Sequence, residues 1–248
     1  MARALGTRAR FAVAYLLLGA AVGGGLGAFA VLLKRPGPKP PPPWSSWQPS
    51  SASRPSQVLE IADHIGQSYQ QATGNQLAAV RVGSPRSSNV RAIGIPTKSP
   101  PKTLADFKLY DKNRSVIFIL CGDGKRCSIG DGKPTPARGT ALRREALELA
   151  LYTLKYEDPV DNVLVFFPPD SAKAKLSLTL FFHRSDLKTP LGHPLRRTLP
   201  QAQPPESGQL SAKEKRNVDD LTASNIFRYI EIAPAPGYGS VLVVQPVA

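Results

Sequence analysis

Residues 11–33 most limit what this chain can become, because they contain no charged side chain. As an α-helix, these 23 residues would extend about 34 Å, against ~30 Å for the hydrocarbon core of a bilayer. Every backbone polar group inside a bilayer must be paired within the segment itself, so the segment must be helical there. The sequence therefore predicts a single transmembrane helix over residues 11–33.

Three glycines of this segment, Gly19, Gly23 and Gly27, recur at every fourth position. They would lie on one face of the helix and form two overlapping small-xxx-small repeats, which allow another membrane helix to approach closely. Glycine is also common in membrane helices in general, and we prefer this plainer explanation.

The ends of the segment bear on its processing and its orientation. Residues 28–30 read Ala-Phe-Ala, which has the form of a signal-peptide cleavage site after Ala30. The apolar run is longer than a signal peptide requires and continues to Leu33, so we predict an uncleaved signal-anchor. The short basic tail, residues 1–10, is expected in the cytoplasm, and the rest of the chain on the extracytoplasmic side of the cell membrane.

A Pro/Ser-rich linker is expected over residues 34–55. Its run 36–43 contains six prolines, which lack the amide donor and fix φ, so the run should form an extended polyproline stalk. Trp44 and Trp47 follow. They could dock a partner, lie at the membrane interface or stay exposed on a mobile linker, and the sequence does not separate these alternatives.

The hydrophobic pattern after residue 55 predicts an α+β domain over residues 56–248. Helical spacing predicts helices from residue 56 to a stop at Gly74, at 141–156 and at 211–225. Apolar runs of strand length predict strands at 77–82, 116–121, 162–167, 176–182, 227–233 and 241–245. The expected architecture is a mixed sheet of about five or six strands with three helices. Strand 116–121 should be central, 162–182 should form a hairpin, and the prolines near 189–210 predict a flexible loop.

The net charge of +14 at first suggests a nucleic-acid or polyanion binder. Half of this charge lies next to the apolar segment, since seven basic residues and no acidic residue precede Glu60. The rest of the chain has no run of five like charges and no nucleic-acid recognition motif. We therefore expect no nucleic-acid partner.

Cys121 and Cys127 are the two cysteines of the chain. The segment between them contains two glycines and can turn back on itself, and an even cysteine count outside the cytoplasm favours pairing. The spacing is not that of redox dithiols, and two cysteines without a nearby histidine are too few for a structural zinc site. We predict a disulfide, and no metal or other cofactor.

No catalytic residue is predicted, because His64, His183 and His193 are dispersed and no nucleophile motif accompanies them. The Gly-Asp-Gly sequences at 122–124 and 130–132 lack the frame of a phosphate loop or a calcium site and predict tight turns. An envelope hydrolase that uses one histidine with serine or carboxylate groups gathered near 121–144 is the alternative.

Arg138, Arg143 and Arg144 cluster at the start of the helix predicted at 141–156, where they could contact an anion or an acidic partner surface. Basic side chains are unfavourable near the positive end of the helix dipole, so carboxylates could compensate them. We prefer this second explanation, with Asp123, Asp131 or Glu145 as the compensating residue. Arg144 can also pair with Glu148 one turn later on the same helix.

These features together predict a single-pass membrane protein whose extracytoplasmic domain is a non-enzymatic binding or assembly module at the cell envelope, with a protein partner. Binding of anionic wall polymer or lipid headgroups through the basic stalk is a further alternative. The oligomeric state is left open.

Overall fold

The structure is a computed structural model that describes residues 7–34, 42–69, 76–83, 90–130, 134–174, 178–201, 203–206, 208–235 and 239–247. The chain divides into two compact units, Met1–Pro42 and Pro43–Ala248, and each is considered by itself.

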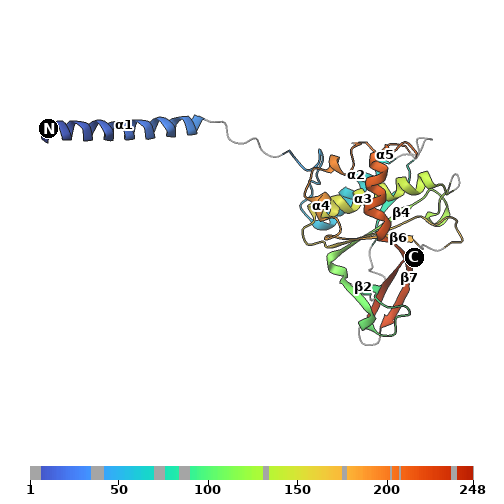
Figure 1. The fold of residues 1–248 in the computed structure, drawn as a ribbon. Helices are drawn as coiled ribbons and strands as arrows, with labels where there is room; N and C mark the ends of the chain where they lie inside the picture. The colour runs from blue at the N-terminus through green and yellow to red at the C-terminus, as the bar shows by residue number, and fades with distance from the viewer. Residues whose placement is uncertain are drawn as a thin grey trace. The chain divides into compact units, whose positions relative to one another are not determined.

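The first unit contains one helix, α1 (Thr7–Lys34), which covers the apolar segment (Figure 1). Its side chains are described at 11–25 and 29, and the large apolar ones among them are 55–74% exposed. Over the part of the chain that the structure describes, no helix is both long enough and apolar enough to cross a membrane. The transmembrane assignment of residues 11–33 therefore stays a prediction.

Several other sequence predictions concern residues that the structure describes only in part or not at all. The tail 1–6 and the stalk residues 35–41 lie outside them. Gly19 and Gly23 have nothing within 4 Å of an added Cβ beyond their own helix. Gly27 and Ala30 belong to α1, but their side-chain surroundings are outside the described part.

The second unit begins at Pro43, earlier than the domain boundary expected at residue 56. Residues 43–53, which we call the N-terminal strap, pack on the helices. The ring of Trp44 meets that of Tyr152 edge to face, with 5.4 Å between centroids, and the ring of Trp47 stacks on His64 at 3.8 Å. Large aromatic rings gain much from such burial. The boundary therefore lies before the strap, and not after residue 55.

The second unit is built on one mixed sheet of eight strands, two or three more than the sequence predicts. The strands are β1 (Ala79–Gly83), β2 (Val90–Pro96), β3 (Phe107–Asp111), β4 (Ser115–Cys121), β5 (Asn162–Phe166), β6 (Leu178–His183), β7 (Ile226–Ala235) and β8 (Gly239–Pro246). Their order is β1-β4-β5-β6-β7-β8-β2-β3. The pairs β4–β5 and β2–β8 are parallel and the others antiparallel, so the β5–β6 hairpin is confirmed.

The apolar strand β4 is second from one edge of the sheet and not central, because the short β1 pairs outside it. The strand that is buried at every position is its neighbour β5. The prediction of a central β4 is therefore wrong, although both of its edges are paired.

The described part of this unit contains four α-helices: α2 (Arg54–Ser68), α3 (Pro136–Tyr156), α4 (Lys188–Leu191) and α5 (Ala212–Thr222). Ser53, Thr135 and Ser211 cap α2, α3 and α5 through their side-chain oxygens. Helix α3 begins five residues earlier than predicted, because Pro136 suits a first turn that needs no amide donor. The three longer helices confirm the predicted number, and α4 is an added single turn.

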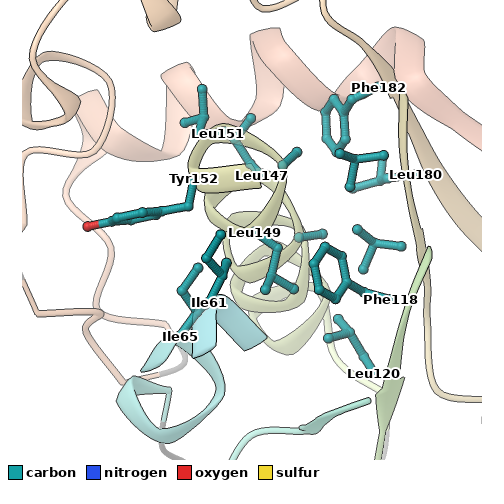
Figure 2. Packing of buried hydrophobic residues seen from close by; sticks show 14 of the residues in the cluster. Ile61, Ile65, Phe118, Leu120, Leu147, Leu149, Leu151, Tyr152, Leu180 and Phe182 are labelled. Carbon is teal, nitrogen blue, oxygen red and sulfur yellow. The ribbon is translucent and has the colours of Figure 1, made fainter. Parts of the chain in front are cut away.

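The main hydrophobic core lies between one face of the sheet and the helices. Figure 2 shows Phe118 and Leu120 of β4, with Phe182 of β6, facing α3, while Ile61 of α2 packs from another side. Nearly every residue of α3 from Thr140 to Leu154 is buried. Helix α3 is therefore the centre of the helical layer.

A second core lies on the other face of the sheet. It consists of Val90, Ile93, Ile117, Leu164, Phe166, Phe181, Phe227, Leu242 and Val244. These residues come from strands at both ends of the sheet order, and the ring of Tyr110 on the edge strand β3 lies 4.8 Å from that of Phe181 on β6. The sheet is therefore curled. Strands β2, β3 and β8 fold over the face of β4 to β6 that points away from the helices.

The loop predicted near 189–210 contains the end of α4 and a 3-10 turn at Leu195–Arg197. Its Leu199 is buried, and the amide of Leu195 donates to the carbonyl of Trp44 at 2.7 Å. The described part of this loop is thus attached to the helices and to the strap.

Candidate functional site

A pocket of about 460 Å³ lies where the start of α2 meets the end of β1, the start of β4 and the curled-over strands β2 and β8. Its lining residues are Arg54, Pro55, Val58, Leu59, Val82, Gly83, Val90, Ile93, Lys112, Ser115, Val116, Ile117 and Leu242. The pocket depends on the curl of the sheet, because β4 and β2 are far apart in the strand order.

The wall of the pocket is mainly apolar, since nine of the thirteen lining residues are aliphatic or proline and one is glycine. Val58, Val90 and Ile93 are at most 4% exposed, whereas Leu59 is 52% exposed and lies at the rim. Small-molecule sites typically measure 300–1,000 Å³ and have such walls with a few polar groups. The pocket has the size and the lining of a site for an apolar ligand.

Three polar residues, Arg54, Lys112 and Ser115, complete the lining. The Ser115 hydroxyl donates to the carbonyl of Asp111 at 2.7 Å and accepts from Asn162 at 3.1 Å, so it is engaged within the domain. Arg54 donates through Nη1 to the carbonyl of Asn113 at 2.9 Å. Among the described residues, neither Arg54 nor Lys112 has a carboxylate within 4.0 Å. The pocket therefore carries two cations without ion-pair partners.

Local sequence places both cations. Arg54 is the first residue of α2, which starts there because Ser53 caps the helix and Pro55 suits its first turn. Lys112 begins the 3-10 turn Lys112–Arg114 between β3 and β4, which Asp111 caps by accepting from the Asn113 amide at 2.8 Å. The bond from Arg54 to Asn113 then holds the two segments together at one end of the pocket.

The predicted disulfide is present and joins Cys121 to Cys127, at the end of β4 away from the pocket. The Gly122 amide donates to the carbonyl of Cys127 at 3.1 Å, and the Gly124 amide donates to that of Ser128 at 3.0 Å. A Cβ at Gly122 would collide with the Ser128 backbone. The 122–124 sequence is therefore a tight turn, as predicted. Asp131 and Gly132 of the second Gly-Asp-Gly sequence lie outside the described residues.

The predicted anion contact at Arg138, Arg143 and Arg144 is not an open site. Arg144 is 1% exposed and pairs with Glu148 at 3.0 Å and Glu214 at 2.6 Å. Arg143 pairs with Asp219 of α5, and Arg138 is 7% exposed. Pairing with carboxylates is thus the outcome for Arg143 and Arg144. The pair of Arg144 with Glu148 is the one expected one turn along the helix, whereas Glu214 and Asp219 of α5 take the place of Asp123, Asp131 and Glu145.

The histidines do not form a hydrolase triad with the groups around them. His183, Ser185 and Asp186 share one turn, but the Ser185 hydroxyl donates to Asp186 at 3.1 Å, while His183 Nδ1 accepts from the Ser185 amide at 3.5 Å. A triad needs the imidazole to accept the hydroxyl proton. His64 stacks on Trp47, and burial lowers its pKa. Within the described residues, no group of three His, Cys, Asp or Glu side chains could hold a metal.

The chain was compared with protein families, curated proteins and solved structures, and none of the three comparisons gave a match. The function has to be inferred from the chain itself. The sequence did not predict the pocket residues, because no local pattern indicates that Lys112, Leu242 and Arg54 line the same pocket.

Proposed function

We propose that this protein is a membrane-anchored binding module, without enzymatic activity, whose domain binds an apolar ligand in the pocket between α2 and the curled sheet. The observation that supports this function is the pocket itself, with about 460 Å³ and nine apolar lining residues. Burial of apolar ligand surface supplies the affinity, and the few polar groups orient the ligand.

The anchor in this proposal is the segment 11–33, with the N-terminus in the cytoplasm and the domain on the extracytoplasmic side of the cell membrane. The segment is uncharged and is preceded by Arg3, Arg8 and Arg10. The disulfide suits an oxidising compartment. The face with Gly19, Gly23 and Gly27 would be the contact for a helical partner within the membrane.

A neutral fluorescent probe such as N-phenyl-1-naphthylamine tests the pocket. We expect the purified full-length protein in detergent micelles, after correction for probe in empty micelles, to bind one probe molecule. Val82→Trp places a ring in the pocket and should reduce this affinity at least about tenfold, since a filled cavity no longer buries the probe. The control is Arg81→Trp, which adds the same ring to the exposed neighbouring position.

Both variants are compared after thermal melting shows that they fold. Equal probe affinity of Val82→Trp and Arg81→Trp would contradict the proposed pocket function.

A further inference from the structure

The two cations of the pocket are linked through one hydrogen bond. Lys112 is followed directly by Asn113, whose carbonyl accepts from Arg54 at 2.9 Å, so the guanidinium reaches the 3-10 turn that carries Lys112. Ser115 closes the same turn. The polar part of the lining thus comes from one turn and from the first residue of α2.

The rest of the lining is apolar. Val82 and Gly83 end β1, and Val90, Ile93 and Leu242 come from β2 and β8, on the curled-over part of the sheet. No residue from these strands adds a charge to the lining. The pocket therefore combines two cations with an otherwise apolar wall.

Asp111, Asp161 and Glu157 do not form ion pairs with the two cations. Asp111 is exposed and caps the Asn113 amide, and Asp161 pairs with Arg114 and Arg184. Glu157 forms no ion pair with Arg54 within 4.0 Å, and burial raises the pKa of this carboxyl, with the charge of Arg54 acting in the opposite direction. An anion from outside the chain would find both cations available.

We infer that the pocket binds a single-chain amphiphile, with its anionic head at Arg54 and Lys112 and its hydrocarbon chain between α2 and strands β1, β2 and β8. This inference rests on the proposed binding function and adds the chemical class of the ligand. Arg and Lys form charge-assisted hydrogen bonds with carboxylates and with phosphates. The head therefore belongs to a free fatty acid or to a single-chain phospholipid.

The volume limits the length of the chain. If each non-hydrogen atom takes roughly the volume of a water molecule, ~30 Å³, then 460 Å³ holds on the order of fifteen atoms. A chain of about ten to fourteen carbons with its head would fill the pocket.

A homologous series of ligands tests this inference by displacement of the neutral probe. Saturated carboxylates from eight to sixteen carbons are compared with alcohols of the same length. Affinity should rise about fourfold for each added methylene and level off where the pocket is full. Carboxylates should bind roughly ten- to a hundredfold more tightly than the matching alcohols, which is the range for hydrogen bonds to charged groups.

The double variant Arg54→Gln with Lys112→Gln should bind carboxylates and alcohols of the same length equally, because it has lost both cations of the pocket. Lys213→Gln removes an exposed cation on α5 and should behave as the wild type. An alkyl phosphate of the same length identifies the source of the head: tighter binding than the carboxylate indicates a phospholipid, and weaker binding indicates a free acid.

The outcomes separate the two proposals. Absence of neutral-probe binding would contradict the pocket function itself. Binding of the neutral probe with equal affinity for carboxylates and alcohols in the wild type would overturn the anionic head and leave the pocket function standing.

Discussion

Arg144 is a charged residue of the helical layer and is only 1% exposed. Glu148 and Glu214 balance it, and the Tyr69 hydroxyl accepts from Arg144 while it donates to Glu148 at 2.6 Å. Desolvation of such a charge costs several kcal/mol unless every donor is satisfied. The network therefore fixes how α2, α3 and α5 meet, and it does not offer a charge to an external partner.

Glu145, one residue further along α3, has no such compensation. It is 0% exposed, and neither carboxyl oxygen has a hydrogen-bond partner among the described residues. Burial, and then the charge of Glu148, raise its pKa well above 4.5. The folded state thus binds this proton more tightly than the unfolded chain, so its contribution to stability is complete below pH 4.5 and is lost progressively as the pH rises.

We expect Glu145→Met to raise the free energy of unfolding by about 1–3 kcal/mol at pH 7, because it removes an unsatisfied buried group. Stability above pH 5 should also depend less on pH. Urea denaturation at pH 5 and pH 7.5 measures both effects. Glu148→Met is the contrasting variant: it removes a partner of Arg144 and should destabilise by about 3–5 kcal/mol. Destabilisation of equal size by both substitutions would contradict this assignment.

At the scale of elements, the local hydrophobic pattern was sufficient to predict a helix or a strand where the segment itself carries the apolar face that it buries. The six predicted strands and three predicted helices all exist, because each carries its periodicity within the segment. The strands β2 and β3 were missed. Strand β2 contains Gly94 and ends in Pro96, which weakens its strand signal. One of its partners, β8, lies some 150 residues away along the chain, so this pairing has no local signal. The pocket was missed with them, since β2 supplies one of its walls.

The N-terminal strap is held by side chains that a composition-based linker assignment ignores. Both carboxylate oxygens of Glu60 accept backbone amides, from Ser50 at 3.0 Å and from Ser51 at 3.0 Å. These bonds lower the pKa of Glu60 to about 2. Because this pKa is lower in the folded state than in the unfolded chain, ionised Glu60 contributes to folding stability above pH 4.5. This contribution is lost as the pH falls towards 2.

Glu60→Gln should therefore loosen the strap at neutral pH, because an amide accepts these hydrogen bonds less well than a carboxylate. The chain has two tryptophans, and both Trp44 and Trp47 lie in the strap, so quenching of tryptophan fluorescence by acrylamide reports on the strap alone. We expect a larger quenching constant for Glu60→Gln. Asp63→Asn, an exposed carboxylate on the same helix, is the control. Identical quenching in the two variants would show that Glu60 does not hold the strap.

At the scale of the whole molecule, apolar surface is distributed very unevenly between the two units. Among the side chains that the structure describes, eleven large hydrophobic ones are exposed. Eight of them belong to α1, and the other three are Leu59, Leu178 and Val247. Exposed apolar surface of this kind is typical of a membrane or protein interaction site. The second unit has its own two cores, so we expect such an interaction of the unit that contains α1.

The proposed topology makes a prediction about the cysteines in intact cells. A membrane-impermeant maleimide should label Cys121 and Cys127 only after an impermeant reductant has opened the disulfide, because the domain would be outside the cytoplasm. In a background with both cysteines changed to serine, Ala4→Cys should stay unlabelled until the cells are lysed. Carbonate extraction should leave the full-length chain in the membrane fraction, whereas a soluble product that starts at Val31 would show cleavage after Ala30. Free thiols that become accessible only on lysis would overturn both the orientation and the oxidising compartment.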